Sequence, residues 1–395
     1  RLRTGIVVVE IALALMLLTS AGLLFRSLLA MASFDQGLRT DHVFSNYFQL
    51  DARTRYDSPE KIAAFTTTAL DRIQSLPHVK SVAVTSGLPM GYGLMRLPFA
   101  LEGQDRTAVN DLPLADYYAV SPDYLSTLSI ALVRGRAFNA DDAAGRAPVA
   151  IINLELARKL FPDRDPIGHS LKIVRPAGQP GDDWRLIVGI VGDVKPRGPM
   201  SETGPQIYVP FAQQPVPNMT LVLLTDGDAP ALPAQVRDAI HALDANIPFE
   251  TIYEFEATIS YSWVRQRFSM TLFLIFSGIA LVLAAIGIYG VMAYSVTQRT
   301  HEIGIRMALG AQVRNVLALV FGQGARIVGL GLVIGALGSL AGTRLLGALL
   351  FQTSAHDPLT FVAVAALLGG IALLACWLPA RRATKVDPMI ALRSE

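Results

Sequence analysis

The chain has 395 residues, of which 52% are hydrophobic and 17% charged, and its mean hydropathy is +0.41. This apolar content exceeds that of ordinary soluble domains and argues against a purely soluble protein. The net charge of +2 is unevenly distributed: residues 34–266 carry 21 Lys/Arg and 27 Asp/Glu, whereas the other 162 residues carry 13 basic and 5 acidic side chains. An acidic body argues against nucleic acid as a partner, because phosphate neutralisation requires clustered Lys and Arg. Cys376 is the single cysteine, which excludes a disulfide within the chain.

Four apolar stretches are long enough to cross a bilayer core about 30 Å thick, which takes about 20 helical residues. The first is longer than the roughly 7–15 residues of a signal-peptide core, and Arg26 separates it from Ala30-Met31-Ala32, so we expect a retained anchor. Because the chain begins with Arg1, we interpret it as a processed chain or the later part of a longer one. The predicted order is a first transmembrane helix with an outward stalk (1–33), an outer core domain (34–266), a stalk end and second transmembrane helix (267–296), a loop (297–315), a third transmembrane helix (316–351), a short loop (352–358), a fourth transmembrane helix (359–380) and a tail (381–395).

Basic residues in the short connections predict the orientation, because cytoplasmic loops are enriched in Lys and Arg. The loop 352–358 carries none. The basic residues of the two termini and of the loop 297–315 are Arg1, Arg3, Arg299, Arg306, Arg314, Arg381, Arg382, Lys385 and Arg393. Both termini and the loop 297–315 are therefore predicted to be cytoplasmic, which places the body 34–266 outside.

The outer body mixes strand and helix patterns. Strands are predicted over 43–50, 79–85, 149–153, 186–191, 207–209 and 221–225, and helices over 58–76, 154–160 and 232–243. Ser58 and Pro59 are a typical helix start. Segments 87–115 and 175–206 are rich in Gly, Pro and Asp and are predicted to be loops or a flap. Helical patterns over 27–33 and 254–267 predict stalks that continue the first two membrane helices. The predicted fold class is an integral membrane α-helical protein with four transmembrane helices and an inserted α/β (α+β) domain.

The sequence lacks the common motifs of catalytic sites. The six histidines form no i, i+4 pair or HExxH arrangement that would indicate a zinc site. No GxSxG elbow is present, and Gly322-Gln323-Gly324 lacks the Lys-Ser/Thr of a phosphate-binding P-loop. The chain is therefore predicted to be no enzyme and to bind no metal or cofactor itself.

The loop after the second membrane helix carries a compact motif. Glu302 and Arg306 form an i, i+4 pair of favourable polarity, and Ile303 and Met307 share a helix face. Two interpretations are open: an amphipathic turn at the membrane surface, or a docking helix for a cytoplasmic partner. The candidate residues are Arg299, Glu302, Ile303, Gly304, Ile305, Arg306, Met307, Ala308, Leu309, Gly310 and Ala311.

Small and ionisable residues stand out within the third apolar stretch. Gly331, Gly335, Gly338 and Gly342 form two GxxxG patterns, which either allow close helix packing or reflect the general glycine enrichment of membrane helices. Ionisable groups are costly in a bilayer unless they are paired or reach water. Accordingly, Glu10 is expected to reach water near the membrane edge, Arg326 to mark an interface, and Arg344 to point outward.

At these motifs the sequence resembles FtsX-like and MacB-like ABC permeases, closest to the C-terminal module of duplicated permeases without a fused ATPase. The resemblance rests on the loop motif 299–311, on Asp357-Pro358-Leu359-Thr360, and on the C-terminal run 378–393 with Pro379, Arg381, Arg382, Asp387 and Pro388. The segments Tyr124-Leu125 with Leu132-Val133-Arg134-Gly135-Arg136, and Phe161-Pro162 with Asp165-Pro166-Ile167-Gly168, resemble the periplasmic core domain of this family.

The resemblance implies a type VII transporter subunit in the bacterial inner membrane that converts cytoplasmic ATP binding into movement of a periplasmic domain, for export or efflux. It implies an ABC ATPase partner that carries ATP and magnesium, together with the lipid bilayer and a periplasmic adaptor protein. It also implies a second permease module, which is either a second copy in a homodimer or the other half of a longer chain. Two alternatives remain open from the residues: a non-catalytic membrane scaffold that activates an envelope enzyme, and a membrane-anchored hydrolase.

Overall fold

The computed structural model describes residues 2–32, 36–91, 93–103, 111–174, 183–198, 201–249, 251–262, 264–298, 313–346, 353–354 and 357–383. The chain divides into two compact units. One is formed by Arg1–Phe34 with Val264–Glu395, and the other by Asp35–Trp263. A domain is therefore inserted between the first and second long apolar helices.

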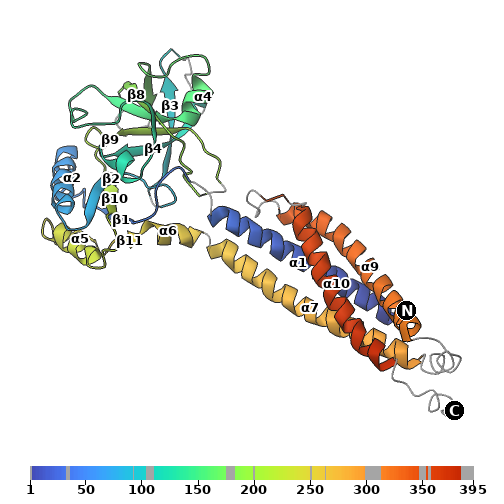
Figure 1. The fold of residues 1–395 in the computed structure, drawn as a ribbon. Helices are drawn as coiled ribbons and strands as arrows, with labels where there is room; N and C mark the ends of the chain where they lie inside the picture. Colours follow the sequence, from blue (N-terminus) through green and yellow to red (C-terminus); the bar gives the residue numbers. More distant parts are fainter. Residues whose placement is uncertain are drawn as a thin grey trace, which may run out of the picture. The chain divides into compact units, whose positions relative to one another are not determined.

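Four long helices make up the helical unit: α1 (Leu2–Ala32), α7 (Val264–Gln298), α9 (Val313–Leu346) and α10 (Pro358–Ala383) (Figure 1). Each contains a segment long and apolar enough to cross a bilayer: Thr4–Ala30, Arg267–Gln298, Gly324–Gly342 and Pro358–Trp377. Helix α7 ends at Gln298 and α9 begins at Val313, so part of the loop expected over 297–315 is helical.

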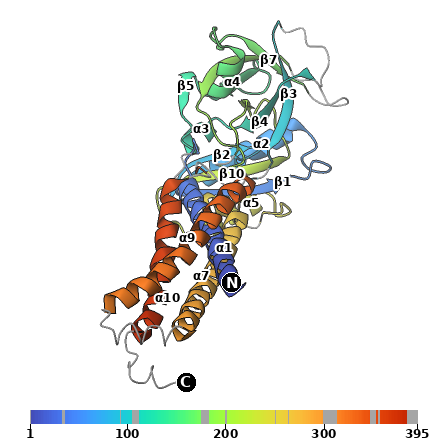
Figure 2. The same ribbon diagram turned by 90° about the vertical axis from the view of Figure 1, so that its right-hand side faces the viewer.

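The four helices share one apolar core. Ile11 and Leu15 of α1 pack with Ile288 of α7, Ile327 of α9 and Leu368 of α10. Helix α1 contacts each of the other three helices, as Figure 2 shows. Large apolar side chains also cover the outer faces, for example Leu337 with 64% and Val362 with 68% exposure. A surface of this kind is suited to hydrocarbon, because exposed apolar patches of that extent are rare in water.

The inserted unit is built on one 11-stranded sheet in the order β11-β1-β10-β2-β4-β3-β7-β8-β6-β9, with β5 paired to β8 and β9 paired also to β4. The strands are β1 (Val43–Gln49), β2 (Val79–Thr85), β3 (Met95–Leu101), β4 (Leu114–Val120), β5 (Leu132–Gly135), β6 (Val149–Asn153), β7 (Ser170–Ile173), β8 (Arg185–Val191), β9 (Gln206–Pro210), β10 (Asn218–Thr225) and β11 (Tyr253–Glu254). The helices are α2 (Pro59–Gln74), α3 (Tyr124–Thr127), α4 (Leu154–Leu160), α5 (Leu232–His241) and α6 (Phe255–Ser262).

Side-chain alternation gives strands β1, β10 and β2 two buried faces. On one face Val82, Val84 and Leu223 join a cluster with α2 and α5. On the other face Ala83 and Val222 join a second cluster with α3 and α6. Helices cover both faces, which fits the continuous apolar run Leu221–Leu224 in β10.

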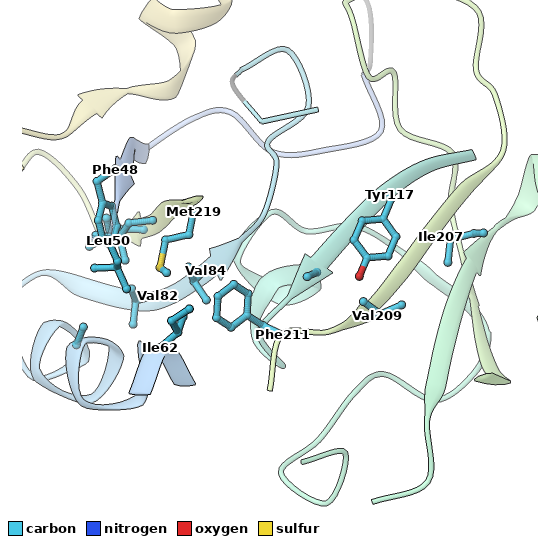
Figure 3. Packing of buried hydrophobic residues seen from close by; sticks show 14 of the residues in the cluster. Phe48, Leu50, Ile62, Val82, Val84, Tyr117, Ile207, Val209, Phe211 and Met219 are labelled. Carbon is cyan, nitrogen blue, oxygen red and sulfur yellow. The ribbon is translucent and has the colours of Figure 1, made fainter. Parts of the chain in front are cut away.

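The pairings of the remaining strands form a closed ring. The pairing runs from β4 through β3, β7, β8 and β6 to β9, and β9 returns to β4 in parallel register, with Tyr117 opposite Ile207. A single register pair, Thr85 with Val120, joins β4 to β2. The same apolar cluster nevertheless extends through both regions, from Phe48 and Leu50 to Tyr117 and Val209 (Figure 3).

The predicted strand and helix segments outside 87–115 and 175–206 are present with small shifts at their ends. The Ser58 hydroxyl caps α2 by accepting from the Lys61 backbone N–H, and Pro59 occupies the first turn as expected.

The prediction of a loop over 87–115 is wrong in part, because this segment contains β3 and the start of β4. Pro98 obscured the strand, yet Leu97, Phe99 and Leu101 alternate inward and β3 pairs with β4 and β7. Within 175–206, the strand predicted over 186–191 is present as β8 (Arg185–Val191), and the segment also contains the first residue of β9, Gln206.

Candidate functional site

The loop motif that the sequence singled out, Arg299 and Glu302–Ala311, lies outside the described residues. The structure describes the helices on its two sides, α7 and α9, which belong to one packed bundle. The motif therefore connects α7 and α9, and both of these helices pack against α1.

The glycines of α9 lie along α1. A Cβ atom added to Gly331 would come within 2.7 Å of Ile11 Cβ, and one added to Gly335 within 2.9 Å of the Ala12 carbonyl oxygen. A Cβ on Gly338 would collide with the Met16 methyl group, whereas one on Gly342 would meet nothing within 4 Å. Three of the four glycines thus permit close approach of α9 to α1, and Gly342 does not take part.

Glu10 lies on the same central helix and faces α7. Its Oε2 atom is shielded from solvent and has no hydrogen-bond partner among the described residues. The atom lies against Gly287 of α7, where a Cβ atom would not fit. This oxygen faces α7 at Gly287, whereas the Glu10 side chain as a whole is partly exposed, so access of Glu10 to water stays a prediction. Arg326 is exposed on α9, and the side chain of Arg344 lies outside the described part of α9.

The Asp357-Pro358-Leu359-Thr360 motif caps α10 and ties it to α1. Asp357 accepts hydrogen bonds from the Thr360 backbone N–H and hydroxyl, and it forms an ion pair with Arg26 of α1. The Thr360 hydroxyl, followed by the Arg26 guanidinium, lowers the pKa of Asp357 to about 2. Gly22, one turn before Arg26, leaves room for the Thr360 methyl group, which a Cβ would approach to 2.8 Å. Sequence reasoning missed this pairing, because its partners are 331 positions apart.

The C-terminal motif is described up to residue 383. Pro379 lies inside α10 and is buried, and the Arg381 guanidinium carbon lies 5.5 Å from the centre of the Trp377 ring. Arg382 belongs to the same helix, whereas Asp387 and Pro388 lie outside the described residues.

Two motifs of the inserted unit meet at β5. Arg134 donates to Asp165 at 2.7 Å, and Arg136 forms a bidentate pair with Asp142 at 2.7 and 2.9 Å. The side-chain hydrogen bond to Asp142 raises the pKa of Arg136. Gly135 has φ +78°, and an added Cβ would clash with the Val188 carbonyl oxygen of β8. The segments 132–136 and 161–168 are therefore a structural unit in which glycine permits the approach of two strands.

Both chain connections to the long helices enter the same core cluster of the inserted unit. After α1, Leu38 packs against the cluster that contains Tyr118, Tyr124 and Val222. Before α7, Phe255 and Ile259 of α6 are buried in that cluster with 0% and 3% exposure. The entry and exit of the inserted unit are thus linked by packed side chains.

Backbone contacts secure the first connection further. The Arg39 N–H donates to the Leu128 carbonyl at 2.7 Å, and the Lys195 N–H donates to the Gln36 carbonyl at 3.2 Å. Gly37, with φ +78°, contacts the Asp193 carbonyl at a point where a side chain would not fit. The Asp193 carboxylate in turn accepts from Asn153 at 2.7 Å, at the start of α4. These contacts therefore link residues 36–39, which follow α1, to Asn153 at the end of strand β6.

These features define a membrane protein with four apolar helices and an inserted α/β domain, and comparison with known proteins gives its family. The model of the MacB-like periplasmic core domain matches residues 4–243, and the FtsX-like permease C-terminal model matches residues 274–388. The chain belongs to the family of FtsX/MacB-like ABC transporter permeases.

Similar proteins include three named exporters. The macrolide export ATP-binding/permease protein MacB of Marinobacter nauticus is 31% identical over 67% of this chain and 41% of its own length. The pyoverdine export ATP-binding/permease protein PvdT of Pseudomonas syringae is 28% identical over 67% and 40%. MacB of Salmonella typhi is 26% identical over 86% and 50%. The chain thus spans about half or less of the length of these curated relatives.

Solved structures with likeness to this chain include two domains. The periplasmic region of MacB from Actinobacillus actinomycetemcomitans covers 57% of this chain and 94% of its own, with 12% identity and a TM-score of 0.38. The extracellular domain of the noncanonic ABC-type transporter YknZ from Gram-positive bacteria covers 53% and 98%, with 16% identity and a TM-score of 0.35.

Proposed function

We propose that this chain is the permease part of an ABC transporter in the bacterial inner membrane, and that it couples ATP binding and hydrolysis in a partner ATPase to movement of its periplasmic domain. ATP and magnesium belong to the ATPase. A second permease module and a periplasmic adaptor complete the assembly. The names of the similar exporters support export or efflux as the outcome, and the basic residues of both termini and of 297–315 support a cytoplasmic position for the ATPase.

The observation that carries this proposal is the shared cluster at the two connections. Movement is transmitted efficiently through packed interiors, because these have low compressibility. Leu38 on one side, and Phe255 and Ile259 on the other, enter one core. A displacement of α1 relative to α7 would therefore act on that core and on the sheet around it.

The loop 299–311 is the proposed contact for the ATPase. An exposed i, i+4 ion pair contributes only about 0.3–0.5 kcal/mol, so Glu302 and Arg306 are better explained by orientation of a partner than by stability. The small residues Gly304 and Ala308 would allow a partner surface to approach the backbone.

The test measures ATP-driven movement in the full chain, in nanodiscs, with the ATPase that co-purifies with it. Spin labels at exposed Thr67 and Arg158, in a Cys376→Ala background, report distances within the inserted unit. We expect the distance distribution to shift on addition of ATP and vanadate. A Gly-Gly-Ser insertion after Ala32 should abolish the shift while ATPase association persists, and the same insertion at the exposed turn by Gly145 should not.

Variants of the loop form the second arm of the experiment. Glu302→Lys with Gly304→Trp should remove ATPase association, whereas Ser354→Trp in the short loop 352–358 should retain it. An unchanged distance distribution in the parent chain, or a shift that survives the insertion after Ala32, would contradict the coupling role. Co-purification of an envelope hydrolase in place of an ATPase would support the scaffold alternative.

A further inference from the structure

The helical unit carries an open apolar groove between α9 and α10. The groove is shallow and open along one side, with a volume of about 880 Å³. The groove is lined by Phe321 of α9 and by Ala366, Leu367, Gly370, Ile371, Leu373, Leu374 and Trp377 of α10. Leu374 and Trp377 are 66% and 48% exposed, so the groove is accessible from the surface of the bundle.

Two small residues of α10 line the groove. Ala366 and Gly370 lie one turn apart on α10, and an added Cβ at Gly370 would meet nothing within 4 Å. This glycine therefore serves no close helix contact within the bundle, unlike Gly331 and Gly335. Its lack of a side chain leaves space at the surface that an occupant can fill.

The length of the groove matches one leaflet of a bilayer. Ala366 and Trp377 are separated by roughly 16 Å along the helix axis at 1.5 Å per residue. Half of a hydrocarbon core about 30 Å thick is nearly the same length. Phe321 and Trp377 place aromatic rings at one end, which is where membrane proteins concentrate aromatic residues at the lipid–water interface.

A positive charge follows directly beyond that aromatic end. Arg381 lies one turn after Trp377, and its guanidinium carbon is 5.5 Å from the ring centre. Arginine binds phosphate through a planar fork of N–H donors. The neighbouring Arg382 and Lys385 add positive charge in sequence, which favours a lipid with net negative charge over a zwitterionic one.

We propose that the groove between α9 and α10 holds one acyl chain of an anionic phospholipid, with the lipid phosphate at Arg381. The apolar lining takes the chain, the space at Gly370 accommodates it, and Trp377 marks the level of the ester region. This site is independent of the ATPase and of the exported substrate.

The test uses quenching of Trp377 fluorescence by brominated lipids in the full chain, with Trp184→Phe and Trp263→Phe to leave one tryptophan. Brominated phosphatidylglycerol at a low fraction in phosphatidylcholine vesicles should quench at least two-fold more strongly than brominated phosphatidylcholine at the same fraction. Arg381→Gln should remove this excess. Arg314→Gln, an exposed arginine in the first turn of α9 with the same charge change, should retain it.

A second pair of variants tests the groove itself. Gly370→Leu should fill it and reduce quenching by both lipids. Gly369→Leu, where an added Cβ also meets nothing within 4 Å but which does not line the groove, should leave quenching unchanged. Equal quenching by the two lipids, or unchanged quenching in Gly370→Leu, would overturn the proposal. Absence of quenching by either lipid, together with disulfide formation between copies carrying Leu374→Cys and Cys376→Ala, would show that a second copy covers the groove instead.

Discussion

Gly335 of α9 lies where the backbone of α1 leaves no room for a side chain. An added Cβ would come within 2.9 Å of both the Ala12 carbonyl oxygen and Leu15 Cβ. Gly335→Leu should therefore lower the stability of the helical unit by about 1–3 kcal/mol, the usual effect of overpacking. Gly342→Leu is the matched control, because open space surrounds that glycine. Thermal unfolding in detergent should show a lower midpoint for the first variant and a near-parental one for the second; equal midpoints would contradict close packing at Gly335.

The ion pair between Arg26 and Asp357 gives a second prediction for single residues, with a defined pH dependence. The hydrogen bond from Thr360 and the pair with Arg26 lower the pKa of Asp357 from an ordinary value of 3.8 to about 2. The ionised form is therefore favoured in the folded state. Its contribution to stability is complete above the unfolded-state pKa and is lost as the pH falls through 3.8 towards 2.

Asp357→Asn should accordingly lower the unfolding midpoint of the full chain at pH 7, and the difference from the parent should shrink below about pH 4. Arg26→Gln should also lower the midpoint. The effects of the two variants should not add in the double variant, because both remove one interaction. Fully additive effects, or a difference that is constant down to pH 3, would show that the pair does not stabilise the bundle.

At the scale of elements, β5 and β8 approach each other closely at two glycines. Gly135 pairs with Gly189, and each would place a Cβ against the backbone of the other strand, at Val188 and Arg136 respectively. Gly135→Ala should destabilise the inserted unit by about 1–3 kcal/mol more than Gly145→Ala. Gly145 has a similar φ of +75° but open surroundings, so the comparison separates steric contact from backbone strain. Equal losses in denaturant unfolding would mean that backbone strain alone matters.

The elements that sequence patterns predicted well are those with strong local signals. The helix after Ser58 has a capping hydroxyl and a proline at its start, and strand β6 with helix α4 has the predicted bounds, 149–153 and 154–160. Strand β3 was missed because Pro98 lies in a segment, 87–115, whose Gly, Pro and Asp content is typical of a loop. The inward alternation of β3 is stabilised by β4 and β7, which come from other parts of the chain. The local sequence pattern of a segment does not show which distant strands will pair with it.

The same distinction applies to the candidate site. The GxxxG patterns suggested close packing, but the sequence did not indicate that α1 is the partner or that Gly342 faces open space. The motif 357–360 was recognised, whereas its partner Arg26 was read as the end of an apolar segment. The sequence also did not indicate that one carboxylate oxygen of Glu10 faces Gly287 of α7, because the two residues are far apart in the chain.

For the whole molecule, orientation determines whether the proposed coupling can operate. Basic residues concentrate at the termini and in 297–315, and the inserted unit is acidic. Cytoplasmic loops are enriched in Lys and Arg, so the inserted unit should face outward and both ends inward. The ATPase would then meet 299–311 on the side where ATP is present.

Cysteine labelling in spheroplasts measures this orientation directly. In a Cys376→Ala background, a cysteine at exposed Thr67 of α2 should react with a membrane-impermeant maleimide in intact spheroplasts. A cysteine at Ser394 should react only after the membrane is permeabilised, and this reaction is the control for its accessibility. The opposite pattern would place the inserted unit and the proposed ATPase contact on the wrong sides of the membrane. Coupling of cytoplasmic ATP hydrolysis to this domain would then be excluded, whereas the packing at Gly335 and the pair of Arg26 with Asp357 would be unaffected, because both lie within the helical unit.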